Sequence, residues 1–214
     1  ADVRIAAVDA LPQVTETGLK LSVTQVLERL RNDERQIRLS AVRALTQVSV
    51  RGCKIAIPIV EEQLTDEDPL MRESAVEAYC KVVLVSDEKA ITTLGRLLQD
   101  SDFRVRRAVV EGLREAVKIG DVHAIFTVSD ALDHANFDIR KSGCYAFLSV
   151  AEKGDENVVE EVCRRFESDR AEVRRSALRA LELVVMRNAE HAIFQVCERL
   201  EHEASETRKT ALKA

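Results

Sequence analysis

Apolar residues recur along the chain in two alternating stripes, and the spacing of three and four residues within each stripe puts the side chains on one face of an α-helix. In its first copy the first stripe consists of Val3, Ala7, Val8, Leu11 and Val14. The second stripe starts at Val23 and continues through Val26 and Leu30. The pattern predicts pairs of amphipathic helices, and we call the first helix of each pair helix A and the second helix B.

Both stripes repeat every 34 residues, without insertion or deletion. An arginine at the edge of the helix A stripe marks the period, at Arg4, Arg38, Arg72, Arg106, Arg140, Arg174 and Arg208. A period of this length indicates a helical repeat, in which each pair has more apolar surface than it can bury alone and must stack on its neighbours. We therefore expect an all-α solenoid, an α–α superhelix of about six pairs and a partial seventh, in a single array over residues 1–214.

Signals for turns and helix caps fall at fixed positions of the repeat. Between helix A and helix B stand Gly18, Gly52, Gly120 and Gly154, with Ser86 and Asn188 in the other two copies. Glycine suits a left-handed residue after a helix C-terminus. The next residue is an aspartate in three copies, at Asp87, Asp121 and Asp155, where a carboxylate can accept hydrogen bonds from the first N–H groups of helix B. Caps before helix A are expected at Asp68, Asp102 and Asn136.

Two segments, residues 102–109 and 172–181, resemble the Val-Arg-x-x-Ala-x-x-Ala-Leu core of HEAT repeats. The closest variety is the short, HEAT-like repeat named after phycobiliprotein lyases. The tryptophan-containing tetratricopeptide pattern and the Thr-Pro-Leu-His motif of ankyrin repeats are absent. The resemblance covers the whole chain, and it implies a right-handed superhelix with the A helices on the convex side and the B helices lining the concave side.

Composition and the chain ends bear on the partners, the cellular compartment and the length of the array. The net charge is −5 and 32% of residues are charged, in mixed sign, which is typical of a solvated surface and makes nucleic acid an unlikely partner of the chain as a whole. Five cysteines, an odd number, favour a reducing intracellular compartment such as the cytoplasm, and no apolar run is long enough to span a membrane. Neither end shows a polar capping repeat, so we expect a piece of a longer array that could also associate end to end.

The sequence predicts no catalytic, cofactor or metal site. The glycines follow the repeat rather than a phosphate loop, and no His-Glu-x-x-His, Gly-x-Ser-x-Gly or Cys-x-x-Cys motif is present. The adjacent acids Glu160 and Glu161 are expected on a solvated helix face rather than in a catalytic pair with perturbed pKa values. We therefore predict a protein that is not an enzyme.

The repeated arginine is expected to have a structural role. It lies next to a buried position in every copy, where it can pair with acidic linker residues such as Asp66, Asp68, Asp100 and Asp102 or with helix-end carbonyls of an adjacent repeat. We predict that the seven arginines form an intramolecular ladder rather than a phosphate-binding row.

The face of helix B opposite its apolar stripe is the predicted partner-binding surface. It carries more acidic than basic residues, unlike a surface that grips duplex DNA. It also carries apolar and aromatic residues that packing within the array does not explain. The predicted partner-binding residues are Ile55, Pro58, Ile59, Arg96, His123, Phe126, Arg164, His191 and Phe194. The leading hypothesis is a scaffold that holds a segment of a partner protein along this concave face.

Two alternatives remain open. A basic row on the A helices, Arg107, Lys141, Arg175, Arg179 and Lys209, could bind nucleic acid or another acidic ligand, although Glu111 and Glu182 nearby favour a balanced, solvated face. The family resemblance alone also suggests a subunit of a phycobiliprotein-lyase-like enzyme or a chaperone.

Overall fold

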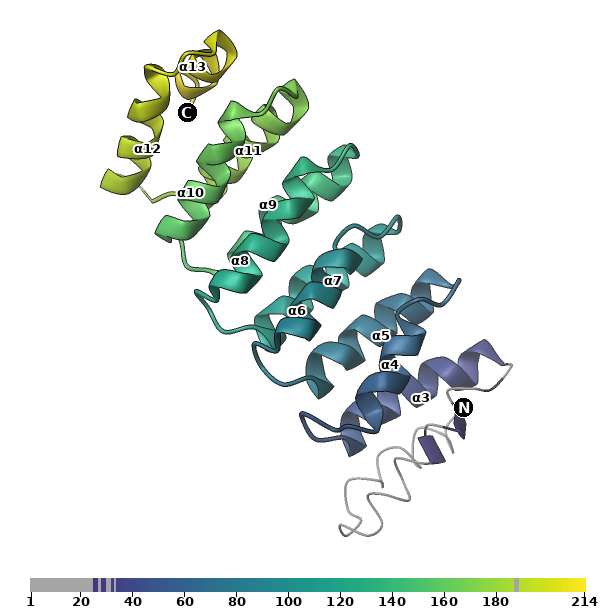
Figure 1. The fold of residues 1–214 in the computed structure, drawn as a ribbon. Coiled ribbons are helices and arrows are strands. Elements are labelled where there is room, and N and C mark those ends of the chain that lie inside the picture. Colours follow the sequence, from purple (N-terminus) through teal and green to yellow (C-terminus); the bar gives the residue numbers. More distant parts are fainter. Residues whose placement is uncertain (1–24, 27, 30–31, 33, 187–188) are drawn as a thin grey trace. The chain divides into compact units, whose positions relative to one another are not determined.

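A computed structural model describes residues 25–26, 28–29, 32, 34–186 and 189–214, and every regular element among these residues is a helix (Figure 1). The fold is all-α, as the sequence predicts. The helix A elements are α3 (Arg35–Val48), α5 (Pro69–Val82), α7 (Phe103–Ala116), α9 (Phe137–Val150), α11 (Ala171–Val184) and α13 (Ser205–Ala211). The helix B elements are α4 (Ala56–Gln63), α6 (Glu88–Leu97), α8 (Val122–Ser129), α10 (Glu156–Arg164) and α12 (Glu190–Leu200). Two 3₁₀ turns, η2 (Asp130–Asp133) and η3 (Arg165–Glu167), extend α8 and α10.

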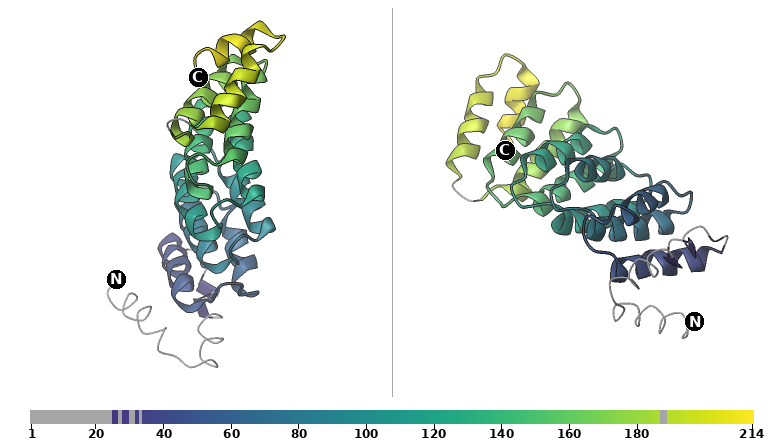
Figure 2. Two further views of the ribbon diagram at one scale, coloured as in Figure 1. Left: turned by 90° about the vertical axis from the view of Figure 1, so that its left-hand side faces the viewer. Right: turned by 60° about the horizontal axis from the view of Figure 1, so that its bottom comes forward.

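The chain divides into two compact units, residues 1–84 and residues 85–214. Unit 1 contains α3, α4 and α5, and unit 2 contains α6 to α13. In unit 2 the A helices α7, α9 and α11 pack on one another in sequence, and the B helices α6, α8, α10 and α12 do the same, which gives two layers of helices (Figure 2). A single array over residues 1–214 stays a prediction.

The predicted apolar stripes form the interior between the two layers. Val105, Val109 and Leu113 of α7 are buried, and so are Ile125 and Val128 of α8. Because each stripe faces both its own partner helix and the neighbouring pairs, every pair in the middle of unit 2 depends on its neighbours for burial.

The turns between helix A and helix B have the predicted backbone. Gly120 and Gly154 have φ values of 82° and 87°, and Ser86 adopts the same left-handed region at 60°. The Gly120 N–H donates to the carbonyl of Val150 at 2.8 Å, in the last turn of the next A helix, and Gly154 donates to Val184 at 2.7 Å. Each turn therefore also ties one repeat to the next. The equivalent turns predicted at Gly18 and Asn188 lie outside the described residues.

The predicted N-caps are also present. The carboxylates of Asp87 and Asp121 accept hydrogen bonds from the N–H groups of Ala90 and Ala124, and that of Asp155 accepts from Asn157. In α6, α8 and α10 the cap thus satisfies one or two N–H groups of the first turn before any packing between repeats.

Candidate functional site

The repeated arginines bind backbone carbonyls of the linker that precedes their own A helix. Nη1 of Arg140 donates to the carbonyl oxygens of His134 and Ala135 at 2.8 and 2.6 Å. The same pattern, with carbonyls six and five residues before the arginine, holds for Arg72, Arg106, Arg174 and Arg208. Arg38 donates to the carbonyl of Asn32, six residues before it. Arg4 lies outside the described residues.

Three of these arginines also reach the next repeat. Nε of Arg106 lies 3.3 Å from Ser142 Oγ, and Nε of Arg140 donates to Ser176 Oγ at 2.9 Å. Arg174 pairs with the Glu206 carboxylate at 3.1 Å. These three guanidinium groups are buried, so they are occupied within the protein and are not available to an outside ligand.

Unit 2 places three predicted partner-binding residues around one pocket, which we call the α8–α10 pocket. It has a volume of about 580 Å³ and is lined from both helices and from η2 and η3. The lining residues are His123, Phe126, Thr127, Ser129, Asp130, Asp133, Glu161, Arg164, Arg165, Glu167 and Ser168. Phe126 is 44% exposed, which is high for an aromatic side chain. The pocket therefore combines an exposed ring with charged side chains.

An ionic network of Arg165, Glu161, Ser129 and Asp133 lines part of this pocket. Arg165 donates from Nη1 to Glu161 Oε2 at 3.1 Å and from Nη2 to Ser129 Oγ at 3.0 Å. Its Nη2 also lies 2.8 Å from Asp133 Oδ2. The second carboxylate oxygen of Glu161 lies 2.9 Å from Arg164 Nη1, a close ion pair that lacks hydrogen-bond geometry. Because α8, η2 and α10 all contribute, the network fixes the spacing of two neighbouring repeats.

Glu161 corrects one expectation from the sequence. It is 4% exposed, whereas Glu160 is exposed as predicted. The reason is that the repeat position of Glu161 faces the neighbouring B helix rather than solvent. The equivalent residue Thr127 of α8 is half-buried as well, with its methyl group beside Gly95 of α6.

Sequence reasoning did not identify Arg165 and its partners, although a signal was present. Arg165 and Arg199 occupy one repeat position, and each pairs with an acid 32 residues before it, Asp133 and Glu167 respectively. Arg199 also donates to the Gln195 side chain at 2.8 Å, as Arg165 does to the equivalent Glu161. Arg165 and Arg199 thus form a second periodic feature, at the C-terminal ends of the last two helix B elements.

Asp130 also lines the pocket, but no arginine forms a salt bridge with its carboxylate in the described part of the chain. It is exposed, and in the part of the chain that the structure describes it forms no salt bridge. Partial burial raises the pKa of Asp130 above its ordinary value, Arg165 lowers it, and the like charges of Asp133 and Glu161 raise it. A carboxylate with a raised pKa is one whose negative charge is poorly compensated.

The other predicted partner-binding residues lie apart from the pocket. Arg96 is exposed on α6, and His123 Nε2 lies 3.3 Å from Thr92 Oγ1 of that helix. Phe194 is exposed on α12, whereas His191 is half-buried. In unit 1, Ile55 and Pro58 are exposed and Ile59 is half-buried.

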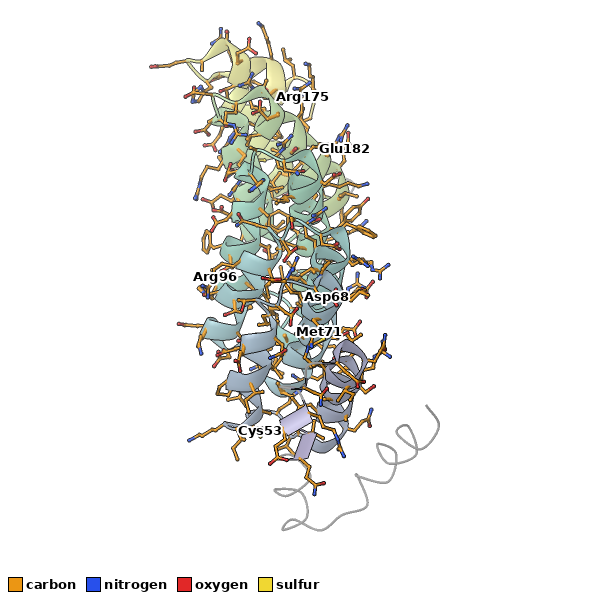
Figure 3. The ribbon with its side chains drawn as sticks, turned by 90° about the vertical axis from the view of Figure 1, so that its right-hand side faces the viewer. Cys53, Asp68, Met71, Arg96, Arg175 and Glu182 are labelled. Atoms are coloured by element: carbon orange, nitrogen blue, oxygen red, sulfur yellow. The ribbon has the colours of Figure 1, made fainter. Side chains whose placement is uncertain are left out.

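The predicted basic row lies on the outer side of the A-helix layer, and all five of its side chains are exposed. Figure 3 shows Arg175 and Glu182 on one side of unit 2 and Arg96 on the opposite side. Glu111 lies 3.9 Å from Arg107. Among the described residues, no group of three His, Cys, Asp or Glu side chains could hold a metal ion.

Comparison with known proteins identifies the repeat. Residues 57–149 match the family model for HEAT repeats. The HEAT-like repeats protein of the archaeon Thermococcus onnurineus NA1 has a similar structure, with 18% identity, 98% of this chain and 90% of that chain covered, and a TM-score of 0.52. YibA of Escherichia coli is 14% identical over 97% of this chain and 72% of its own, with a TM-score of 0.48.

A designed armadillo repeat protein in complex with a (KR)4 peptide is 16% identical over 89% of this chain and 97% of its own, with a TM-score of 0.45. No curated protein matches the chain. The family match and the archaeal structure agree with the alternating helices described above. They support the resemblance seen in the sequence: residues 57–149 match HEAT repeats, and the archaeal HEAT-like protein shares the fold.

Proposed function

We propose that the protein is a non-enzymatic scaffold that holds a segment of a partner protein on the B-helix side of unit 2, centred on the α8–α10 pocket. Stacked helical repeats leave a long surface on each side, and proteins of this architecture use such surfaces for binding. An exposed aromatic residue beside a pocket is the usual anchor of a protein interface. The exposed Phe126 ring in the lining of a pocket between two repeats is the observation that carries the proposal.

The partner segment carries a lysine or arginine that enters this pocket. The lining contains four carboxylates, Asp130, Asp133, Glu161 and Glu167, and two guanidinium groups, Arg164 and Arg165. Asp133, Glu161 and Glu167 are each paired with an arginine, which leaves Asp130 for an incoming cation. The aliphatic stem of that side chain would lie along the Phe126 ring.

Two buried cysteines support a role other than catalysis. Burial raises the pKa of the thiols of Cys144 and Cys163 to about 11, so both stay protonated and unreactive near neutral pH. All five cysteines are free, in keeping with the proposed reducing compartment. None of the described helices is both long and apolar enough to cross a membrane.

The test is a selection of displayed random peptides on three immobilised proteins: wild type, Phe126→Ala and Asp130→Asn. We expect wild type to enrich peptides with a lysine or arginine next to an apolar residue. Asp130→Asn should lose the preference for the basic residue, and Phe126→Ala should bind all selected peptides more weakly. Enrichment of the same sequences by all three proteins would exclude the pocket as the binding site.

Affinity purification from the native cell, followed by mass spectrometry, would then identify the physiological partner. Recovery of a protein that binds wild type but not Phe126→Ala is the expected result. A partner whose binding depends on Phe126 but not on Asp130 would support the scaffold and contradict the basic side chain.

A further inference from the structure

The outer side of the A-helix layer in unit 2 carries a second set of exposed side chains, which we call the A-helix face. It comprises Phe103, Arg107, Arg114, Phe137, Lys141, Tyr145, Arg175, Arg179 and Lys209, all of them exposed. They come from α7, α9, α11 and α13 and occupy the solvent side of each helix. None of them belongs to the α8–α10 pocket, so this surface is independent of the proposed function.

The face has a surplus of positive charge in a chain whose net charge is −5. Six of its members are cations, and the acids that line its clefts are Glu111 and Glu182. Glu111 lies beside Arg107, and Lys209 pairs with Glu206 at 2.7 Å. Arg114, Lys141, Arg175 and Arg179 form no salt bridge within the described residues. The charge balance that the sequence suggested for the basic row therefore does not extend to Lys141, Arg175 and Arg179.

Aromatic rings alternate with these cations and stand in two clefts between the helices. The cleft between α7 and α9 has a volume of about 340 Å³, and Phe103, Arg107, Arg114 and Tyr145 line it. The cleft between α9 and α11 has a volume of about 300 Å³ and is lined by Phe137, Lys141, Tyr145 and Arg179. The Tyr145 ring stands in the wall of both clefts. The Arg179 guanidinium lies 5.2 Å from the centre of the Phe137 ring, so planar cationic and aromatic groups already stack there.

We propose that the A-helix face binds single-stranded nucleic acid, with its phosphates on the unpaired cations and its bases in the two clefts. A positive surface with interspersed aromatic rings is the arrangement that binds single strands without strong sequence preference. A duplex would keep its bases stacked inside and leave the rings without a partner. A membrane surface favours apolar groups that protrude and insert, whereas these rings form the walls of clefts.

The first measurement is the fluorescence anisotropy of a labelled 12-nucleotide oligo(U) with the 214-residue chain at 50 and 200 mM salt. If the cations of the face make about five phosphate contacts, affinity should fall about 100-fold between these salt concentrations. Absence of binding at 50 mM salt would overturn the proposal. So would binding to phosphatidylserine vesicles without binding to the oligonucleotide.

Two matched sets of variants locate the site. The triple change Lys141→Gln, Arg175→Gln and Arg179→Gln should weaken binding and make its salt dependence shallower, because three phosphate contacts are lost. The control triple Lys89→Gln, Arg96→Gln and Lys153→Gln removes the same charge elsewhere on unit 2 and should bind at least ten times more tightly than the first triple. Equal losses in the two triples would show that only net charge matters and would overturn the site.

Variants of Tyr145 distinguish the contribution of base stacking from that of phosphate contacts. Tyr145→Ala should weaken oligo(U) binding about tenfold with an unchanged salt dependence, and Tyr145→Phe should bind like wild type, because it keeps the ring. Circular dichroism of each variant confirms that the exposed substitutions leave the helices intact. Equal binding by Tyr145→Ala and Tyr145→Phe would contradict a base in the clefts.

Discussion

The two outer faces of unit 2 use arginine in opposite ways. On the A-helix side, the buried arginines Arg106 and Arg140 bind carbonyl and hydroxyl oxygens, and the buried Arg174 also pairs with the Glu206 carboxylate. On the B-helix side, Arg165 and Arg199 bind carboxylates, yet Asp130 is left over. The 34-residue period determines the stacked helix pairs, which are the same on both sides. The charge of each face depends on whether its arginines bind carbonyl groups or carboxylates.

Loss of Arg165 should give the largest effect, because it leaves the buried Glu161 carboxylate without its main partner. We expect Arg165→Ala to lower the free energy of unfolding by about 3–5 kcal/mol. The neighbouring Arg164→Ala removes an exposed guanidinium and should cost less than about 1 kcal/mol. Urea unfolding followed by circular dichroism measures both. Similar losses from the two variants would show that the network does not hold α8 and α10 together.

Loss of Arg140 should come second, because its removal leaves carbonyl oxygens rather than a charge unsatisfied. Arg140→Ala is expected to lower the free energy of unfolding by about 2–3 kcal/mol. The adjacent Lys141→Ala, on the exposed A-helix face, should change it by less than about 0.5 kcal/mol. If Arg140→Ala unfolds at the same urea concentration as Lys141→Ala, the repeated arginine does not stabilise the stacked helices.

These arginines show how far the sequence alone could go. The period of Arg72, Arg106 and their equivalents predicts the helix pairs, the turns at Gly120 and Gly154 and the buried stripes, because each repeat copies the same local physics. The hydrogen-bond acceptors of these arginines were harder to predict from the sequence. The acid-rich linkers around Asp66 and Asp100 suggest carboxylates, but it is the main-chain carbonyls of these residues that accept the hydrogen bonds.

The α8–α10 pocket could be predicted only in part. Phe126, His123 and Arg164 follow from the outward side of helix B, since that side is fixed by the 3.6-residue period. The burial of Glu161 and its pairing with Arg165 depend on how closely two neighbouring B helices approach. A helical wheel describes one helix and gives no distance to its neighbour. The clefts beside Tyr145 likewise depend on two helices at once.

Removal of the Asp130 charge should give the smallest change in stability, and in the opposite direction. Because burial and the neighbouring carboxylates hold the pKa of Asp130 above its ordinary value of 3.8, the ionised form destabilises the folded state. This destabilisation is absent below pH 3.8 and grows as the pH rises through the raised pKa. Asp130→Asn should therefore raise the free energy of unfolding slightly at pH 7, and the gain should shrink as the pH is lowered toward 4.

The matched control is Asp133→Asn, which removes a carboxylate that pairs with Arg165 and should destabilise the protein at pH 7. Thermal unfolding at several pH values measures both variants. A lower stability of Asp130→Asn than of wild type at pH 7 would show that this carboxylate already has a cationic partner, and the pocket would then have no place for a basic side chain.

The most direct measurement titrates two ligands, a basic peptide selected by wild type and labelled oligo(U), into two variants of the chain. One variant is Asp130→Asn, and the other is the triple change Lys141→Gln, Arg175→Gln and Arg179→Gln. Separate faces of opposite charge predict that Asp130→Asn loses peptide affinity and keeps oligonucleotide affinity, and that the triple variant does the reverse. If either variant weakens both ligands equally, the two faces do not act as separate binding surfaces.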